Sequence, residues 1–164
     1  MNYYKLPGCV ALLLFVLIFP VSASMVSILL VETGLNEEAP LTQHSSLWEG
    51  ALMSSFFDAG HIVTNSPILR LEEKPQQALN IALKSDFEDA ASGGADFIVL
   101  CLLEFQSQAR GAAPADVSIR TYRADTQELI FEQNFPTGRG RNQNEEYQFA
   151  QNAGNVIVSR IMGR

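Results

Sequence analysis

Cysteine and histidine are scarce in this sequence, which contains two of each among its 164 residues. Such numbers are too small for a disulfide framework or a typical four-ligand zinc site. Basic residues are also few: 11 lysines and arginines face 18 acidic residues, so the formal net charge is −7. Because phosphate binding needs concentrated positive charge, we expect no nucleic-acid partner.

The sequence also lacks the common catalytic motifs: the nucleophile elbow, the Walker loop, the Rossmann glycine fingerprint and the HExxH zinc helix. Gly93-Gly94 precedes an expected strand, so we interpret it as a helix stop and not as a phosphate loop. His44 and His61 flank an expected helix and would lie about 25 Å apart, too far for a shared metal site. We therefore predict no catalytic, cofactor-binding or metal-binding residues. A small envelope hydrolase that uses acidic groups such as Asp86 or Glu104 is the alternative.

The composition that is present suits one globular domain. Hydrophobic residues make up 47% of the chain, charged residues 18% and aromatic residues 9%. These values exclude the collagen-like, coiled-coil and wholly disordered classes. The length fits one ordinary domain, and neither an internal repeat nor a dividing linker is visible.

The N-terminal segment has the pattern of an export signal. Its apolar run from Val10 to Phe19 would span about 15 Å as a helix, roughly half of the hydrocarbon thickness of a membrane. Val21 and Ala23 occupy the two small-residue positions before a signal-peptidase site. We predict that residues 1–23 are a signal peptide and that residues 24–164 form one periplasmic domain. Retention of the segment as an uncleaved anchor is the alternative, and it would be the only membrane contact.

Neither cysteine is expected to form a disulfide or to carry a lipid. Cys9 lies before the apolar run, whereas the cysteine of a lipobox follows it. Cleavage would remove Cys9 and leave Cys101 alone in an apolar stretch. A lone thiol in such a stretch is typical of a buried core residue.

Apolar periodicity predicts the element order β-α-β-α-β-β-β-α, an α/β (α+β) fold with a mixed β-sheet and flanking helices. Continuous apolar runs at 25–32 and 97–105 are typical of strands that are covered on both faces. The remaining strands are expected at 61–65, 116–123 and 128–135, and helices within 41–59, 75–92 and 147–161. Residues 68–74 have no clear pattern.

Side-chain spacing also predicts which residues face the core. Trp48, Leu52 and Phe56 recur at helical spacing, so we interpret Trp48 as a core residue and not as an exposed binding anchor. The last two strands alternate apolar and polar residues, as in an antiparallel hairpin with one covered face. Val117 and Ile119 are expected to share one face of the first strand, and Leu129, Phe131 and Phe135 one face of the second.

Four passages together resemble a known family. They are the apolar strand at 26–31, the helix that ends before Gly60-His61-Ile62-Val63, the helix-glycine-Ala-Asp-strand passage at 90–99, and the hairpin at 117–131. The set resembles the small periplasmic α/β domain shared by the TolB N-terminal domain, the curli secretion protein CsgG, LpoB-type penicillin-binding-protein activators and flagellar accessory proteins. Gln127 stands where this family commonly has glycine.

The resemblance implies a non-catalytic envelope protein that acts by protein–protein contact in cell-envelope, secretion or motility machinery. A ligand-binding periplasmic protein is a further alternative. We expect partner contact at the hairpin turn of Asp125, Thr126 and Gln127 and at a loop that contains Arg139 and Arg141. Loops on a rigid scaffold commonly carry recognition, and the two arginines stand out in an acidic chain. The partner is expected to be another envelope protein, which the sequence does not identify.

Overall fold

The computed structural model describes residues 23–36, 40–71, 76–106, 113–136 and 142–162. Its strands are β1 Met25–Thr33, β2 Ile62–Asn65, β3 Leu69–Leu71, β4 Phe97–Glu104, β5 Asp116–Arg123 and β6 Leu129–Pro136. Its helices are α2 Gln43–Asp58, α3 Gln76–Ser92 and α4 Gln143–Met162. The predicted order is confirmed except for β3, a short strand within the segment that had no clear pattern.

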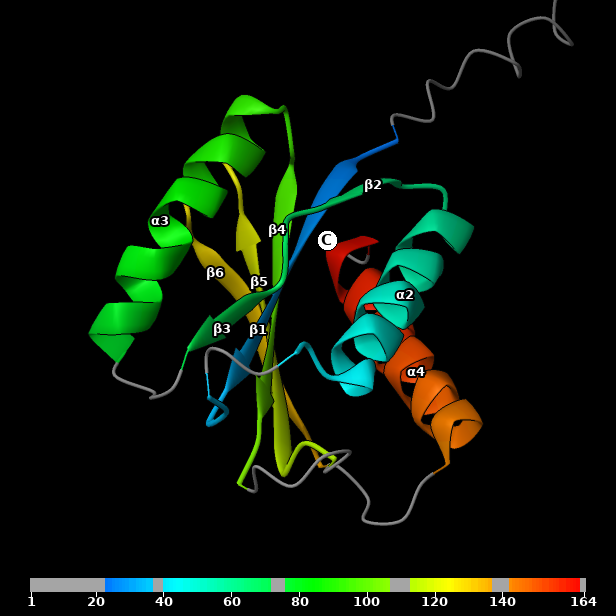
Figure 1. Cartoon of the computed structure of the whole chain (residues 1–164). Coiled ribbons are helices and arrows are strands. Elements are labelled where there is room, and N and C mark those ends of the chain that lie inside the picture. Colours follow the sequence, from blue (N-terminus) through cyan, green and yellow to red (C-terminus); the bar gives the residue numbers. More distant parts are fainter. Residues whose placement is uncertain (1–22, 37–39, 72–75, 107–112, 137–141, 163–164) are drawn as a thin grey trace, which may run out of the picture.

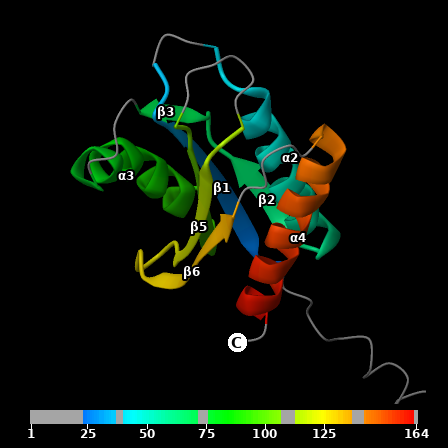
Figure 2. The ribbon, with the colours of Figure 1, turned by 90° about the horizontal axis from the view of Figure 1, so that it is seen from below.

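The six strands form one mixed sheet in the order β2-β1-β4-β5-β6, with β3 also pairing with β1. Strand β1 runs parallel to β2, β3 and β4, while β4, β5 and β6 form an antiparallel meander. Helices α2 and α4 cover one face of the sheet and α3 covers the other (Figures 1 and 2). The expected α/β domain with a mixed sheet and flanking helices is therefore confirmed.

Burial on both faces explains why β1 and β4 are almost wholly apolar. Alternate residues of these strands, such as Ile28 and Val99, pack beneath α2 and α4 around the buried ring of Trp48. The residues between them, such as Leu29 and Leu100, pack beneath α3. The core position predicted for Trp48 is confirmed. Among the described segments, no helix is long and apolar enough to cross a membrane.

Cys101 lies within β4 and is a free, buried thiol. Burial raises its pKa far above the ordinary value for a thiol because the apolar surroundings do not solvate a thiolate. The prediction of a buried core cysteine is confirmed, and the thiol is expected to react very slowly with alkylating reagents in the native protein.

One expectation about the hairpin is wrong. The register of β5 and β6 shifts between Thr121 and Tyr122, so that Phe131 lies opposite Thr121 and Leu129 lies opposite Tyr122. The extra residue, Ile130, forms a β-bulge, which interrupts the two-residue alternation. Leu129 therefore does not share the covered face with Phe131, and 46% of its surface is exposed.

The contact between α2 and α4 depends on a glycine. A Cβ atom added to Gly154 would lie 2.6 Å from the Oγ atom and 2.7 Å from the Cβ atom of Ser55. Ser55 is itself held in place, because its hydroxyl lies 3.0 Å from the carbonyl oxygens of both Ala51 and Gln151. The two helices can approach this closely only where α4 has no side chain.

Replacing Gly154 with alanine should therefore lower the free energy of unfolding by about 1 kcal/mol. The clash with Ser55 should outweigh the roughly 1 kcal/mol that alanine contributes to a helix interior. Gly50→Ala is the matched control, since a Cβ atom there meets no atom within 4 Å, and it should raise stability by about 1 kcal/mol. Urea denaturation of both variants measures the difference. Equal gains in stability for the two variants would contradict the packing account.

Candidate functional site

The predicted contact residues Asp125, Thr126 and Gln127 form the exposed turn between β5 and β6. The turn is closed by main-chain hydrogen bonds: the N–H of Gln127 donates to the carbonyl of Arg123 at 2.9 Å, and the N–H of Arg123 donates to that of Glu128 at 2.9 Å. It is joined to the sheet because the buried Ala124 donates its N–H to the carbonyl of Asp96 at 3.0 Å. The three exposed side chains thus stand on a supported backbone.

Gln127 has a left-handed backbone conformation, with φ of 54°. Residues with a side chain adopt this conformation at a cost, which explains why glycine suits the position. Gln127→Gly should therefore raise the free energy of unfolding by about 0.5–1 kcal/mol. Thr126→Gly, at a position outside the left-handed region, should instead lower it by about the same amount. Thermal denaturation of both variants tests this, and a stability loss for Gln127→Gly would refute it.

The other two predicted contact residues, Arg139 and Arg141, fall in residues 137–141 and lie outside the described residues. Their role stays a prediction.

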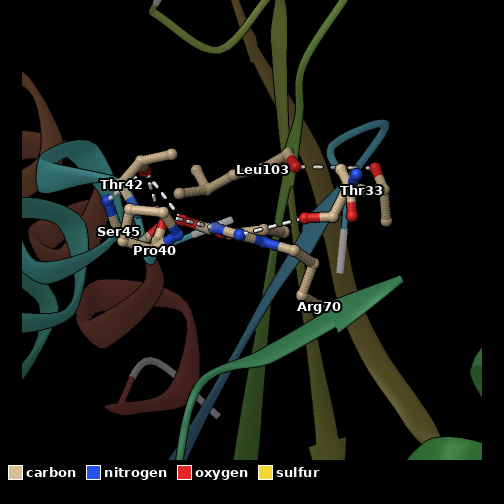
Figure 3. Close-up of polar contacts among 8 residues, drawn as sticks. Thr33, Pro40, Thr42, Ser45, Arg70 and Leu103 are labelled. Carbon is tan, nitrogen blue, oxygen red and sulfur yellow. Dashed lines mark hydrogen bonds and ion pairs between the residues drawn. The ribbon is translucent and has the colours of Figure 1, made fainter. Parts of the chain in front are cut away.

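A buried charge network that the sequence analysis missed lies at the C-terminal end of β1. Glu32 is completely buried, and one of its carboxylate oxygens accepts hydrogen bonds from the N–H of Thr42 at 2.9 Å and from its hydroxyl at 2.7 Å. The hydroxyl of Ser45 donates to the same oxygen. The other oxygen accepts from Nε of Arg70 at 2.7 Å and from its Nη2. Figure 3 shows Thr42, Ser45 and Arg70 in this cluster, which joins β1, β3 and the start of α2.

Arg70 carries the network on to the segment that links β1 to α2. Its Nη1 donates to the carbonyl of Asn36 at 3.2 Å, and its Nη2 donates to that of Pro40 at 3.0 Å. Its side chain is only 5% exposed. The guanidinium thus connects Glu32 to the main chain on both sides of residues 37–39. All three nitrogens of the guanidinium donate hydrogen bonds within the protein, which indicates a structural role.

The electrostatic balance at Glu32 favours its charged form. Burial by itself would raise the pKa of this carboxyl, but hydrogen bonds from Ser45, Thr42 and Arg70 outweigh burial and hold the pKa below its ordinary value. Glu32 is therefore a permanent anion at neutral pH. A general acid or base needs a pKa near the working pH, so this carboxylate is not poised for proton transfer.

A second carboxylate joins the N-terminal turns of α2 and α4. Glu146 lies with one oxygen 2.6 Å from Nδ1 of His44, and its other oxygen accepts from Nε1 of Trp48 at 3.1 Å. Next to it, Asn142 and Glu145 form a reciprocal pair of side-chain to main-chain hydrogen bonds, each 3.0 Å long, which caps α4. Both helices therefore begin at the same end of the layer (Figure 1).

The two histidines lie in different surroundings. His44 pairs with Glu146, whereas the buried ring of His61 packs edge-on against Phe56 with ring centroids 5.8 Å apart. Neither ring nitrogen of His61 has a hydrogen-bond partner in the part of the chain that the structure describes. Within those same residues, no group of three or more histidine, cysteine or acidic side chains is arranged to hold a metal ion.

A shallow hollow of about 480 Å³ lies over the start of α2 and α4. Its lining consists of uncharged polar groups, one tyrosine and one leucine: Gln43, Ser46, Leu47, Gln143, Asn144 and Tyr147. Uncharged side chains of this kind can donate and accept hydrogen bonds without favouring an ion of either sign. The hollow lies within the size range of small-molecule sites.

The acidic residues of the alternative hydrolase hypothesis are not brought together. Asp86 lies on α3, six residues before the end of the helix that leads to β4, and Glu104 is the last residue of β4. The seven residue steps from Phe97 to Glu104 span about 23 Å of extended chain. Burial, and then repulsion from Asp89, raises the pKa of Asp86. No described contact pairs Asp86 with a second catalytic group.

The chain resembles known proteins in its fold and not in its sequence. No family model matches the sequence, and no curated protein matches it either. Among solved structures, the chain is similar to the PelC dodecamer from Paraburkholderia phytofirmans, with 8% identity and a TM-score of 0.50 over 81% of this chain and 87% of that one. At this identity the likeness establishes the fold alone.

Two further structures share less of the geometry. TolB from Acinetobacter baumannii has 14% identity and a TM-score of 0.43 over 87% of this chain and 28% of that one. The LpoB C-terminal domain from Salmonella enterica has 14% identity and a TM-score of 0.44 over 71% of this chain and 84% of that one. TolB and LpoB are among the proteins that the sequence motifs resemble. The resemblance to CsgG and to flagellar accessory proteins stays a prediction.

Proposed function

We propose that this chain is an exported, non-catalytic domain of a bacterial cell envelope and that it works by binding another envelope protein. The export signal predicted at residues 1–23 supports the location. The fold supports the mode of action, since PelC, which has the same fold, was solved as an assembly of protein subunits.

The observation that carries the proposal is the way the chain uses its buried carboxylates. Glu32 and Glu146 each have both oxygens engaged by side chains or main chain of this protein. Such groups hold the fold together, because their oxygens are engaged within the protein and the two side chains are buried. The supported turn of Asp125, Thr126 and Gln127 presents side chains to solvent instead, as a recognition surface requires.

Affinity capture of the tagged full chain from the envelope of the cells that make it tests the proposal. One stoichiometric protein partner, retained after chemical cross-linking, is the expected result. A co-purifying small molecule without a protein partner would favour the ligand-binding alternative, for which the hollow between α2 and α4 is the natural site. Hydrolysis lost on neutralising Asp86 or Glu104, with folding and partner binding intact, would favour the enzyme.

The arginine pair gives a sharper test. Replacing Arg139 and Arg141 together with alanine should leave the melting temperature unchanged and weaken capture of the partner, more visibly at low salt than at high salt. The reason is that positive charges in an acidic chain steer an acidic partner surface, and salt screens this attraction. Unchanged capture at low salt would remove both residues from the contact surface.

A further inference from the structure

The two edges of the sheet differ in how they are protected. The edge strand β6 presents Glu132, Gln133 and Asn134 to solvent and ends at Pro136, and polar or charged residues and proline discourage pairing with other chains. The edge strand β2, with the sequence Ile-Val-Thr-Asn, contains no charge and no proline. It is the less protected of the two.

The main chain of β2 has hydrogen-bonding groups directed away from the sheet. Ile62 donates its N–H to the carbonyl of Ser24 at 3.0 Å, and Ser66 donates to that of Ile28 at 3.2 Å. In a strand, successive residues direct these groups to opposite sides, so Val63 and Asn65 direct theirs outward. No described residue pairs with this outer side, which offers two donors and two acceptors to an incoming strand.

The large apolar residues with the greatest exposure lie beside this same edge. Phe57 is 71% exposed and Ile62 is 55% exposed. Phe57 lies in the last turn of α2, which covers one face of the sheet. Ile62 faces the other side, because its neighbour Val63 packs into the core beneath α2. Helix α2 leads into β2 (Figure 1) through a turn in which the N–H of Gly60 donates to the carbonyl of Phe57 at 2.9 Å, so both residues lie near the start of this edge strand.

Helix α2 and strand β2 carry charge of one sign. Residues 43–68, which include α2 and β2, contain Glu49 and Asp58 and no lysine or arginine. The C-terminal turn of α2 also lacks a basic residue to offset its exposed carbonyl groups. Glu49 lies at the edge itself, because its carboxylate accepts from the Asn65 side chain of β2 at 2.9 Å. A second copy placed edge to edge would add a second such carboxylate there, in a chain whose net charge is already −7. An occupant with basic residues avoids this repulsion.

We propose that the open edge of β2 binds an extended segment of a partner protein, a segment with alternating apolar residues and flanking lysine or arginine. The segment adds a strand to the sheet through the outward groups of Val63 and Asn65. Its apolar side chains contact Ile62 and the C-terminal turn of α2 that contains Phe57, and its basic residues lie near Glu49, whose carboxylate accepts from the Asn65 side chain of β2 at 2.9 Å. The inference rests on the proposed function and names one site for it.

Hydrogen exchange of the full chain with a designed peptide tests the site. The probe is an acetylated, amidated heptapeptide that alternates valine and threonine and has lysine at both ends. At saturating peptide, the amides of Val63 and Asn65 should exchange at least tenfold more slowly, and salt should raise the peptide concentration that half of this protection requires. The same peptide with glutamate at both ends, or with alternate amides methylated, should give little protection.

Variants separate this site from the rest of the surface. The double variant Phe57→Ser with Ile62→Thr should abolish the protection, whereas Val156→Thr, which alters an exposed apolar residue of α4, should leave it unchanged. Absence of protection in the native chain, or equal protection by the glutamate peptide, would overturn the proposal. So would protection of both amides without peptide in a chain that sediments as a dimer, since the occupant would then be a second copy. If the double variant captures the envelope partner as well as the native chain does, the edge proposal fails while the proposed function stands.

Discussion

Replacing Glu32 with glutamine is expected to lower the free energy of unfolding by about 3–5 kcal/mol, the usual cost of leaving one partner of a buried ion pair alone. Glutamine can still accept hydrogen bonds from Thr42 and Ser45. It cannot neutralise Arg70, whose side chain is 5% exposed. The loss should be accompanied by faster proteolysis at Asn36 and Pro40, because Arg70 donates hydrogen bonds to their carbonyl groups. Urea denaturation measures the stability change.

The effect of Glu32 should depend on pH in a defined direction. The pKa of Glu32 in the folded protein lies below its ordinary value of 4.5, so its stabilising contribution is fully present above about pH 5 and is lost as the pH falls through the folded pKa. The stability difference between the native chain and Glu32→Gln should therefore shrink as the pH falls below 4.5. A difference that grows on acidification would contradict the assignment.

A double variant supplies the control. Replacing both Glu32 and Arg70 with methionine leaves no unpaired charge, so it should be less destabilising than the sum of the single replacements. Additive losses of stability would show that the two side chains act independently. Such a result would contradict the hydrogen bonds between Arg70 and Glu32.

Replacing Val99 with aspartate is expected to prevent folding altogether. Val99 is completely buried in β4, beneath α2 and α4. An unpaired carboxylate at such a site costs several kcal/mol, in addition to the lost apolar contact, against a total stability of about 5–15 kcal/mol. The variant should lack the cooperative unfolding transition of the native chain in circular dichroism. A folded Val99→Asp variant would contradict the central position of β4.

The residue opposite Val99 offers a matched control. Thr121 lies across from Val99 in β5, and its buried hydroxyl has no hydrogen-bond partner among the described residues. Thr121→Val removes this unsatisfied group with almost no change of shape, and it should raise the free energy of unfolding by about 1 kcal/mol. Together the two variants show whether stability at this pair of positions depends on the polarity of the side chain or on substitution as such.

The sequence by itself determined those strands and helices in which the pattern of apolar side chains shows which residues are buried. The apolar runs of β1 and β4 predicted strands covered on both faces, and the stripe of Trp48, Leu52 and Phe56 predicted the buried side of α2. The buried state of Cys101 followed from the same run. In each case the signal is local, because burial of consecutive or regularly spaced residues is enough to produce the pattern.

Tertiary structure alone decided the features that depend on partners far along the chain. Strand β3 has three residues and no pattern of its own, and it pairs with β1 where Arg70 meets Glu32, 38 residues away. Trp48 and Glu146, which are 98 positions apart, become partners only when α2 and α4 pack together. The bulge at Ile130 changes the register and turns Leu129 away from the covered face. No residue type in this segment predicts such a bulge. The openness of the β2 edge belongs here as well, since a strand becomes an edge only when the order of the sheet leaves it without a neighbour.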